Sequence, residues 1–317
     1  MELTGNNYPR FNVFESRSSS PALWRINMKQ VKDYYLLHGF AVLVLASLLG
    51  CATQAPHATS VTYLGNCGFL YANEKDKVLV DPFGTEYGNF FHLPSSNTLS
   101  QVNRSRPPFD GIDLLLITHI HGDHYTPSLV EEFLKNNSNT RAVLPPQVLK
   151  DMQKKCGDFT KISAQIISPE LKMNESRKLR VNDVELTVVR MQHGARRDIS
   201  KVPSSEYTEY EKTENYGYIF TIGKKKVFHQ GDGCLKLNEE VINAIGDVDF
   251  GHLSFFDWDV TSFDILKNKL HANWVIFMHG TIPGEEFKRE AFKETYPKLI
   301  KFEKELDCKD FRERLAL

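Results

Sequence analysis

The segment ITHIHGDHYTP, residues 117–127, holds three histidines and one aspartate within six positions: His119, His121, Asp123 and His124. Imidazole and carboxylate groups are ligands suited to zinc, iron or manganese. In an extended segment His119 and His121 point to the same side, and the other two donors follow where the chain turns. Four donors in so short a span do not all reach one ion in tetrahedral geometry. The spacing therefore favours division of the donors between two metal ions, a recurrent binuclear arrangement.

The residues around this cluster predict a strand, a turn and a helix. Residues 112–118 form a nearly continuous apolar run, typical of a central strand buried on both faces. Thr126 and Pro127 suit a helix N-cap and a first helical residue, and an apolar stripe follows at 129–134. The alternative for the cluster is a polar turn between strand and helix. Further donors elsewhere in the chain decide between the two interpretations.

Three such donors occur downstream, each at the end of a predicted strand. His193 ends ELTVVRMQH, Asp232 ends KVFHQGDG before its last glycine, and His279 ends NWVIFMHG before its glycine. Each lies next to glycine, where the backbone can turn and approach a ligand closely. Any of the three taken alone would more often be a surface or packing residue. Their shared position indicates that they converge on the cluster at 119–124.

The rest of the chain alternates between short apolar runs and turns. Strands that come first in a meander, followed by mixed strands and helices, indicate two sheets packed face to face with helices outside, a four-layer α/β arrangement. No linker divides 60–317, which we expect to form one domain. The expected strands are 61–64, 69–72, 77–81, 112–118, 142–144, 162–167, 179–191, 216–222, 226–229, 248–253 and 274–278, and the later expected helices are 241–245, 262–270 and 285–306.

The composition is that of an ordinary folded protein. The chain has 317 residues, 41% of them hydrophobic, and a formal net charge of -1. This length is sufficient for a large buried core. A nearly neutral chain gives no reason to expect nucleic acid as a partner.

The N-terminal part contains a candidate secretory signal at 28–50. Lys29 and Lys32 precede an apolar run at 40–49. This run is much shorter than the ~20 residues that a membrane-spanning helix needs. The alternative is that the run forms an N-terminal helix of the folded domain.

The end of this run, Leu48-Leu49-Gly50-Cys51, resembles the lipobox of bacterial lipoproteins. The resemblance implies that Cys51 is lipidated and becomes the mature N-terminus. It also implies a lipid-anchored protein of the bacterial cell envelope, held at the outer membrane. Residues 51–59 would then form the tether to the domain. Residues 1–27 precede the signal, so we expect the true start at Met28.

The remaining cysteines are Cys67, Cys156, Cys234 and Cys308. Their spacings match no zinc knuckle. An oxidising compartment would permit disulfides, but the sequence selects no pairing, and four separate thiols are an equally good interpretation.

The motif THIHGDH, followed by His193, Asp232 and His279, resembles the signature of the metallo-β-lactamase superfamily. Asp81 in KVLVDPFG resembles the first motif of that family. All five motifs occur in order, and the resemblance covers 60–317. It implies the αββα sandwich, that is, the metallo-β-lactamase fold.

The resemblance also implies a set of ligands for two divalent metal ions, zinc in the first place, with manganese or iron as alternatives. Asp81 would hydrogen-bond a ligand or the backbone beside the site, and His229 is a second candidate for such a supporting role. The implied ligands are His119, His121 and His193 on the first ion, Asp123, His124 and His279 on the second, and Asp232 bridging the two.

Several stretches resemble one branch of the family, which contains ascorbate-6-phosphate lactonase and N-acylphosphatidylethanolamine phospholipase D. These stretches are YLGNCGFLY, VLVDPFG, ENYGYIFTIGKKKVFHQGD and WVIFMHG. The resemblance implies hydrolysis of a phosphodiester, lactone or related ester by a hydroxide that both metals share. Asp123 or Asp232 would act as the proton acceptor. The chain departs from the branch at Asn66, where histidine is common, and at FGHLSFFDWD (250–259), so the substrate stays open.

Two long segments with few regular signals are candidates for the substrate pocket. The segment 83–110 contains Tyr87, Phe90, Phe91 and His92, which can form an apolar wall for a small-molecule or lipid-like substrate. Ordinary packing over the sheet edge explains these aromatic residues equally well.

The second segment, 194–214, begins with Arg196 and Arg197 just after His193. These arginines can pair with a phosphate or carboxylate, or remain solvated. Asn66 and His252 are further candidates for contact with substrate. For His229, which lies inside a predicted strand, a satisfied buried histidine is the alternative to a supporting role.

Two other functions are alternatives to the hydrolysis of a phosphodiester, lactone or related ester. One is a non-catalytic envelope lipoprotein that keeps the metal site for structure or binding, and the other is a β-lactamase. The complete ligand set argues against the first. Asp232 argues against a β-lactamase, because the metal sites of true β-lactamases with this fold have no bridging carboxylate at the corresponding motif.

Overall fold

In a computed structural model of the chain, the structure describes residues 58–88, 90–194, 203–236, 239–254, 257, 259–279, 299–300, 302 and 304–311. These residues belong to one compact unit, 56–317. The expected signal with Cys51, and Arg196 with Arg197, lie outside the described residues. No helix in the described ranges has both the length and the apolar character needed to cross a membrane.

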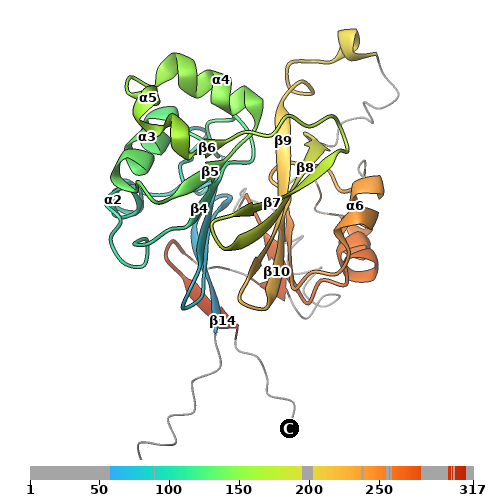
Figure 1. The fold of residues 1–317 in the computed structure, drawn as a ribbon. Helices are drawn as coiled ribbons and strands as arrows, with labels where there is room; N and C mark the ends of the chain where they lie inside the picture. Colours follow the sequence, from blue (N-terminus) through green and yellow to red (C-terminus); the bar gives the residue numbers. More distant parts are fainter. Residues whose placement is uncertain are drawn as a thin grey trace, which may run out of the picture. The chain divides into compact units, whose positions relative to one another are not determined.

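Two seven-stranded sheets form the centre of the described unit (Figure 1). The strand order is β14-β1-β2-β3-β4-β5-β6 in the first sheet and β13-β12-β11-β10-β9-β8-β7 in the second. The first sheet consists of β1 (Thr59–Gly65), β2 (Gly68–Ala72), β3 (Lys77–Val80), β4 (Leu114–Leu116), β5 (Arg141–Val143), β6 (Ile166–Ile167) and β14 (Cys308–Phe311). The second consists of β7 (Ser176–Val181), β8 (Val184–Gln192), β9 (Glu214–Ile222), β10 (Lys225–His229), β11 (Phe250–Leu253), β12 (Trp274–Phe277) and β13 (Leu299–Ile300).

The largest part of the core lies between the two sheets, because alternate residues of each strand point to opposite faces. In β2, Phe69 and Tyr71 join Val188 and Tyr218 of the second sheet in one buried cluster. Leu70, between them in sequence, packs instead with the helices on the outer face of the first sheet. Strand β2 thus buries both of its faces.

Helices cover the two outer faces. Phe133 and Leu134 of α3 pack on the first sheet, and Ile242 of α6 and Phe263 of α7 pack on the second. The helices are α2 (Ser96–Asn103), α3 (Pro127–Asn136), α4 (Pro146–Lys155) and α5 (Phe159–Ile162) on one side, and α6 (Glu239–Ile245) and α7 (Val260–Asp264), continued by a π-helical turn at Ile265–Lys269, on the other. The expected four-layer αββα sandwich is confirmed.

Several expected elements differ from those observed. The expected strand 179–191 is the end of β7 plus β8, because Asn182 takes a left-handed backbone conformation (φ 52°) and turns the chain. Of 162–167 only β6 is a strand, and a short helix and a 3-10 turn precede it. Residues 285–298 of the expected helix 285–306 lie outside the described residues. The expectation is wrong at the end of that range, because Ile300 pairs with Ile276 of β12 and packs between the sheets.

Two helices of the first sheet's outer layer, α2 and α4, were not expected from the sequence. The N-cap of α2 is Ser95, whose hydroxyl accepts a hydrogen bond from the backbone N–H of Thr98. A proline at the first helical position begins α4. The segment 83–110 is therefore partly helical.

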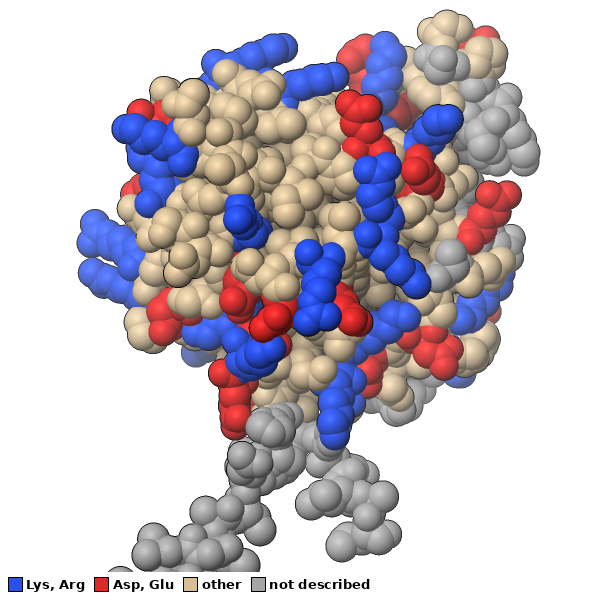
Figure 2. Space-filling view, viewed as in Figure 1, with Lys and Arg blue, Asp and Glu red and all other residues tan. Residues whose placement is uncertain are grey.

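The described cysteines are Cys67, Cys156, Cys234 and Cys308, and no disulfide joins any two of them. The interpretation as separate thiols holds for these four. On the face shown in Figure 2, Lys and Arg side chains are interspersed with Asp and Glu around a region of uncharged residues.

Candidate metal centre

All seven expected ligands follow strands that end at one edge of the two sheets. In the first sheet β3 and β4 are parallel neighbours, and the segment 117–124 continues from β4. In the second sheet β8 and β10 run in the same direction, because both pair antiparallel with β9, and β10, β11 and β12 are parallel. The donors that follow β8, β10 and β12 therefore come together with those that follow β4.

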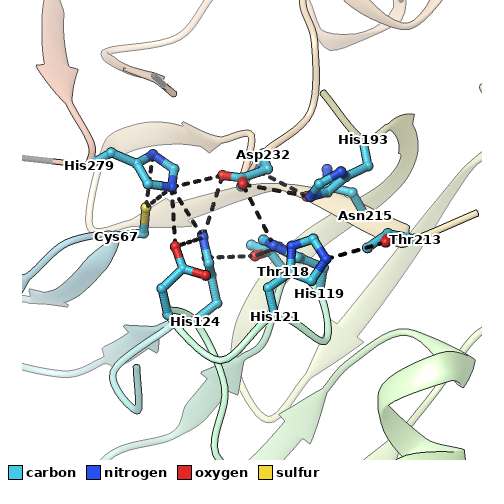
Figure 3. A network of polar contacts seen from close by, with 12 residues as sticks. Cys67, Thr118, His119, His121, His124, His193, Thr213, Asn215, Asp232 and His279 are labelled. Atoms are coloured by element: carbon cyan, nitrogen blue, oxygen red, sulfur yellow. Dashed lines mark hydrogen bonds and ion pairs between the residues drawn. The ribbon is translucent and has the colours of Figure 1, made fainter. Parts of the chain in front are cut away.

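Asp232 lies between two groups of ligands (Figure 3). Its Oδ2 atom lies 3.7 Å from Nε2 of His119 and 3.6 Å from Nε2 of His193. Its Oδ1 atom lies 3.4 Å from Nε2 of His124 and 3.1 Å from Nε2 of His279. One carboxylate thus presents a different oxygen to each group.

The first group contains His119, His121, His193 and Asp232, whose ligand atoms all lie within 4.8 Å of one another. His121 is half-buried, whereas the other three side chains are buried. We call this group the first half-site.

The second group contains His124, His279 and Asp232, and Asp123 contacts it. Oδ2 of Asp123 lies 3.5 Å from Nε2 of His124 and 3.6 Å from Nε2 of His279. The two imidazole Nε2 atoms lie 3.4 Å apart. We call this group the second half-site.

These distances fit metal ligation. Two nitrogen or oxygen ligands of one tetrahedral zinc ion lie about 3.4 Å apart, because each zinc–ligand bond is about 2.0–2.1 Å long. The ligand pairs of the second half-site are separated by 3.1 to 3.6 Å. In the first half-site, the buried Nε2 of His119 has no hydrogen-bond partner among the described residues. A buried polar atom without a partner is costly, and a metal ion there would supply one.

A hydrogen-bond network behind the site orients two of the ligands. Oδ2 of Asp81 accepts from the Thr118 hydroxyl at 2.6 Å and contacts Nδ1 of His124 at 2.8 Å. The Thr118 hydroxyl uses its only proton in this bond to Asp81. The hydroxyl oxygen can therefore only accept a hydrogen bond from Nδ1 of His119, which lies 3.0 Å away. Both imidazoles then direct Nε2 at the site, and this is the atom that binds a metal ion when the ring is neutral. The structure places Asp81 in the supporting position that its motif implies.

Electrostatics separate the two half-sites. Burial lowers the pKa of His119 well below its usual range and that of His121 to about 4. Burial acts in the same direction on His279, but the charge of Asp232 and other nearby anions outweigh it and raise the pKa of His279 well above its usual range. Burial also lowers the pKa of His124, but the neighbouring Cys67, Asp123 and Asp232 outweigh it and raise that pKa well above its usual range. His119 and His121 are therefore neutral imidazoles at neutral pH, whereas His124 and His279 bind protons in the absence of metal.

The two carboxylates are held in their ionised form. Burial raises the pKa of Asp232, but the charges of His279 and His124 outweigh it, and the pKa lies well below its usual range. For Asp123, too, the opposing charge of His124 outweighs burial and the pKa is lowered. Both groups are therefore anionic ligands at neutral pH.

Asn66 contacts a ligand from the other side. Its side-chain Nδ2 donates to the backbone carbonyl of Asp123 at 3.0 Å and to Oδ2 of Asp123 at 3.2 Å. Asn66 is fully buried. This position orients Asp123 and argues against the direct substrate contact expected for Asn66.

The aromatic segment expected near the pocket does reach the site. The Phe91 ring lies 4.9 Å from the His279 ring between centroids. Tyr87 and Phe90, close to Phe91 in sequence, are 51% and 62% exposed, so this segment also carries exposed aromatic surface. The backbone amides of Thr85 and Glu86 both donate to the carbonyl of Gly122, at 2.7 and 3.0 Å.

The remaining two histidines lie deeper. Nε2 of His229 contacts the backbone carbonyl of Cys67 at 3.2 Å, so His229 supports the turn that carries Cys67. His252 is fully buried between the sheets, hydrogen-bonded to the Tyr71 hydroxyl and packed edge-to-face on Phe69. This burial argues against the substrate contact expected for His252.

Three residues beside the ligands were not expected from the sequence. The Tyr210 ring lies 4.3 Å from the His193 ring between centroids, and the Thr213 hydroxyl lies 3.5 Å from Nε2 of His121. Both belong to the segment 194–214, whose general role was expected. The third residue, Cys67, lies beside His279. Its spacing from the other cysteines gave no metal signal, and only its neighbour Asn66 was a candidate.

Comparisons with known proteins agree with this geometry. A family model described as the β-lactamase superfamily domain matches residues 60–251. The metal-dependent hydrolase YtkL of Bacillus subtilis (strain 168) is 24% identical over 246 residues, which cover 75% of this chain and 92% of YtkL.

Solved structures with the same fold include Igni18, a metallo hydrolase of Ignicoccus hospitalis. Its TM-score is 0.52 at 17% identity, with 81% of this chain and 100% of that chain covered. They also include CmlA, a diiron β-hydroxylase of Streptomyces venezuelae, with a TM-score of 0.51 at 13% identity and coverage of 81% of this chain and 55% of that chain. These likenesses concern the fold. The family match, the αββα sandwich and the converging donors show that the chain belongs to the metallo-β-lactamase superfamily.

Proposed function

We propose that this protein is a binuclear metal-dependent hydrolase that cleaves a phosphodiester, a lactone or a related ester. The observation that carries the proposal is the position of Asp232, which presents Oδ1 to the second half-site and Oδ2 to the first. A bridging carboxylate of this kind would hold two ions side by side. The family supports the proposal, as does the name of the relative YtkL, a metal-dependent hydrolase.

The chain's own residues supply binding and proton transfer. Two ions at these positions would lower the pKa of a bound water and polarise the substrate oxygen that gains charge. Asp123 and Asp232 are ionised and lie among the ligands, so either carboxylate can accept the proton of the attacking water. Asn66 restrains Asp123 through two hydrogen bonds, which keeps its carboxylate in position.

The surroundings of the second half-site support a substrate with an apolar part. Phe91 packs against His279, and Tyr87 and Phe90 expose aromatic surface nearby in sequence. An acyl chain or a similar apolar group would contact such a surface favourably. We therefore place the small-molecule or lipid-like part of the substrate here, as the resemblance to the lactonase and phospholipase branch implies.

Lipid anchoring at Cys51 belongs to the same proposal. It is supported by the sequence Leu48-Leu49-Gly50-Cys51 and by the short apolar run before it. Stable anchoring by acyl groups requires more than one chain. Incorporation of a labelled fatty acid into the wild type but not into Cys51→Ala would support this part, and incorporation into both would contradict it.

A substrate panel with metal analysis tests the activity. The purified protein, with its zinc and manganese content measured, is assayed with a chromogenic phosphodiester, a lactone, a thioester and a chromogenic β-lactam, with and without chelator. We expect chelator-sensitive turnover of at least one of the first three. Turnover of the β-lactam alone would indicate a β-lactamase. No turnover by a protein that holds two metal ions would favour the non-catalytic lipoprotein.

A further inference from the structure

Cys67 places a sulfur atom beside the second half-site (Figure 3). Its side chain is completely buried. Its Sγ atom lies 3.5 Å from each ring nitrogen of His279. It also lies within 4.8 Å of the ligand atoms of His124 and Asp232. Three ligands of one half-site therefore surround a side chain that is itself a metal ligand when ionised.

The distance between Cys67 and His279 suits two ligands of one ion. A tetrahedral zinc ion with a sulfur ligand at about 2.3 Å and a nitrogen ligand at about 2.0–2.1 Å separates the two by about 3.6 Å. The Sγ of Cys67 and the Nε2 of His279, the nitrogen that faces the half-site, are 3.5 Å apart. In the adjoining first half-site, Nε2 of His119 is buried and has no hydrogen-bond partner among the described residues, which favours a metal ion in this centre.

The backbone around Cys67 is fixed on both sides. Cys67 lies in the tight turn between β1 and β2, where the backbone amide of Asn66 donates to the carbonyl of His92 at 2.6 Å. The side chain of Asn66 holds the carbonyl of Asp123 at 3.0 Å, and Nε2 of His229 contacts the carbonyl of Cys67 at 3.2 Å. Ligands whose backbone is held in this way are preorganised for a metal ion.

We propose that Cys67 is a thiolate ligand of the metal ion in the second half-site. The inference rests on the proposed metal-dependent function. On metal uptake the Cys67 thiol loses its proton to solvent, and the sulfur binds the ion with His124, His279 and Asp232. A thiolate selects zinc over manganese, because manganese prefers oxygen ligands. The second half-site is thus the part of this centre that specifies zinc.

The other described cysteines provide matched controls. Cys234 is buried like Cys67, but its Sγ atom lies 3.5 Å from a carboxylate oxygen of Asp257. Cys156 contacts the backbone carbonyl of Pro127. Neither belongs to the groups of potential metal ligands in the described residues. A change that appears only when Cys67 is replaced is therefore due to the second half-site.

Cadmium loading tests the proposal. The full chain, Cys67→Ser and Cys234→Ser are loaded with cadmium, and the metal content and the ultraviolet sulfur-to-cadmium charge-transfer absorbance are measured. We expect the absorbance to fall in Cys67→Ser and to stay at the wild-type level in Cys234→Ser. We also expect zinc to bind the second half-site of Cys67→Ser about 100-fold more weakly, since even partners outside the ligand set contribute 10–100-fold.

Two results would overturn the proposal in different ways. Two cadmium ions with equal absorbance in the wild type and Cys67→Ser would reject the thiolate ligand and leave the metal centre intact. A wild-type chain that binds no metal would reject the proposed function as well. In case Cys67→Ser does not fold, X-ray absorption of the zinc-loaded wild type decides, because the proposal requires a zinc–sulfur distance of about 2.3 Å. Only nitrogen and oxygen neighbours would contradict it.

Discussion

At the scale of single residues, Asp232 contributes more than any other ligand, because its two oxygens serve two different groups of imidazoles. Its Oδ1 atom faces His124 and His279, and its Oδ2 atom faces His119 and His193. Removal of the Asp232 carboxylate should therefore weaken metal binding at both half-sites. Removal of one imidazole should weaken metal binding mainly at the half-site to which that imidazole belongs.

We predict that Asp232→Asn lowers the bound metal from two ions to one or none. An amide has a single acceptor oxygen and no charge, so it cannot bridge two cations. We expect kcat/KM to fall by about 100-fold or more, since loss of even an outer partner costs 10–100-fold. Metal analysis and steady-state kinetics measure both effects. The control is Asp247→Asn, whose side chain is 82% exposed, and full metal content in Asp232→Asn would contradict the bridging assignment.

Asp81 acts through other residues. It holds the backbone amide of Thr118 at 2.8 Å and contacts Nδ1 of His124 at 2.8 Å, and its backbone takes a left-handed conformation (φ 42°). Such conformations cost about 1–3 kcal/mol and persist where the surroundings enforce them. The ion that His124 binds should depend on this contact.

We predict that Asp81→Asn weakens zinc binding by about 10–100-fold, as for other partners of metal-bound histidines. The carboxylate of Asp81 contacts the backbone N–H and the hydroxyl of Thr118 and Nδ1 of His124. An asparagine side chain has one acceptor oxygen in place of two, so it cannot keep all three contacts. Competition with a zinc chelator measures the affinity, and circular dichroism verifies the fold. Zinc affinity equal to that of Asp247→Asn would show that Asp81 does not orient His124.

At the scale of elements, the segment after β3 packs tightly on the segment that carries the histidine cluster. A Cβ atom added at Gly84 would lie 2.0 Å from the carbonyl oxygen of Asp123. Thr85 and Glu86 then hydrogen-bond to Gly122. The position of the ligand Asp123 thus depends on the absence of a side chain at 84.

We predict that Gly84→Ala destabilises the protein by about 1–3 kcal/mol, as overpacking of a close contact does, and also lowers its metal content. At Gly157, where an added Cβ atom meets nothing within 4 Å, the same change should stay within about 0.5 kcal/mol. Denaturant unfolding of both variants measures the difference. An unchanged midpoint and metal content for Gly84→Ala would contradict the packing described here.

Most strands could be predicted from apolar runs and turns, because strands between two covered faces are apolar on both sides. The errors have local physical causes. Asn182 adopts a left-handed turn inside an otherwise apolar run, and Ile300 joins a sheet through distant pairing with Ile276. Helix α2 was missed because its N-terminus, where Ser95 accepts a hydrogen bond from the backbone N–H of Thr98, lies in a polar segment without a clear helical pattern.

At the scale of the whole molecule, the site depends on both sheets. The first sheet supplies the histidine cluster and Asp81, and the second supplies His193, Asp232 and His279. The histidine–aspartate motif and the glycine-flanked strand ends made these positions predictable. Cys67 was not predictable as a ligand, because a single cysteine in a tight turn carries no spacing signal. The packing of the two sheets on each other brings its sulfur to His279.

We predict that metal binding releases protons at neutral pH. In the metal-free protein burial lowers the pKa of His124 and His279, but neighbouring groups outweigh it, with Cys67 the largest contributor for His124 and Asp232 for His279, so both pKa values are raised. A raised pKa means that these imidazoles remain protonated at pH values where a free histidine is neutral, and only neutral imidazole binds metal. Metal affinity should therefore rise with pH through and above neutrality. Calorimetry in two buffers with different ionisation enthalpies measures the release, and equal heats in both would contradict it.

The central claim is that one carboxylate joins two half-sites, each of which holds a metal ion. Anomalous diffraction from crystals of the zinc-loaded protein tests it most directly. We predict two zinc peaks about 3.5–4 Å apart, the usual spacing of binuclear sites, one on each side of the Asp232 carboxylate. A single peak, or two peaks that do not share Asp232, would contradict the claim.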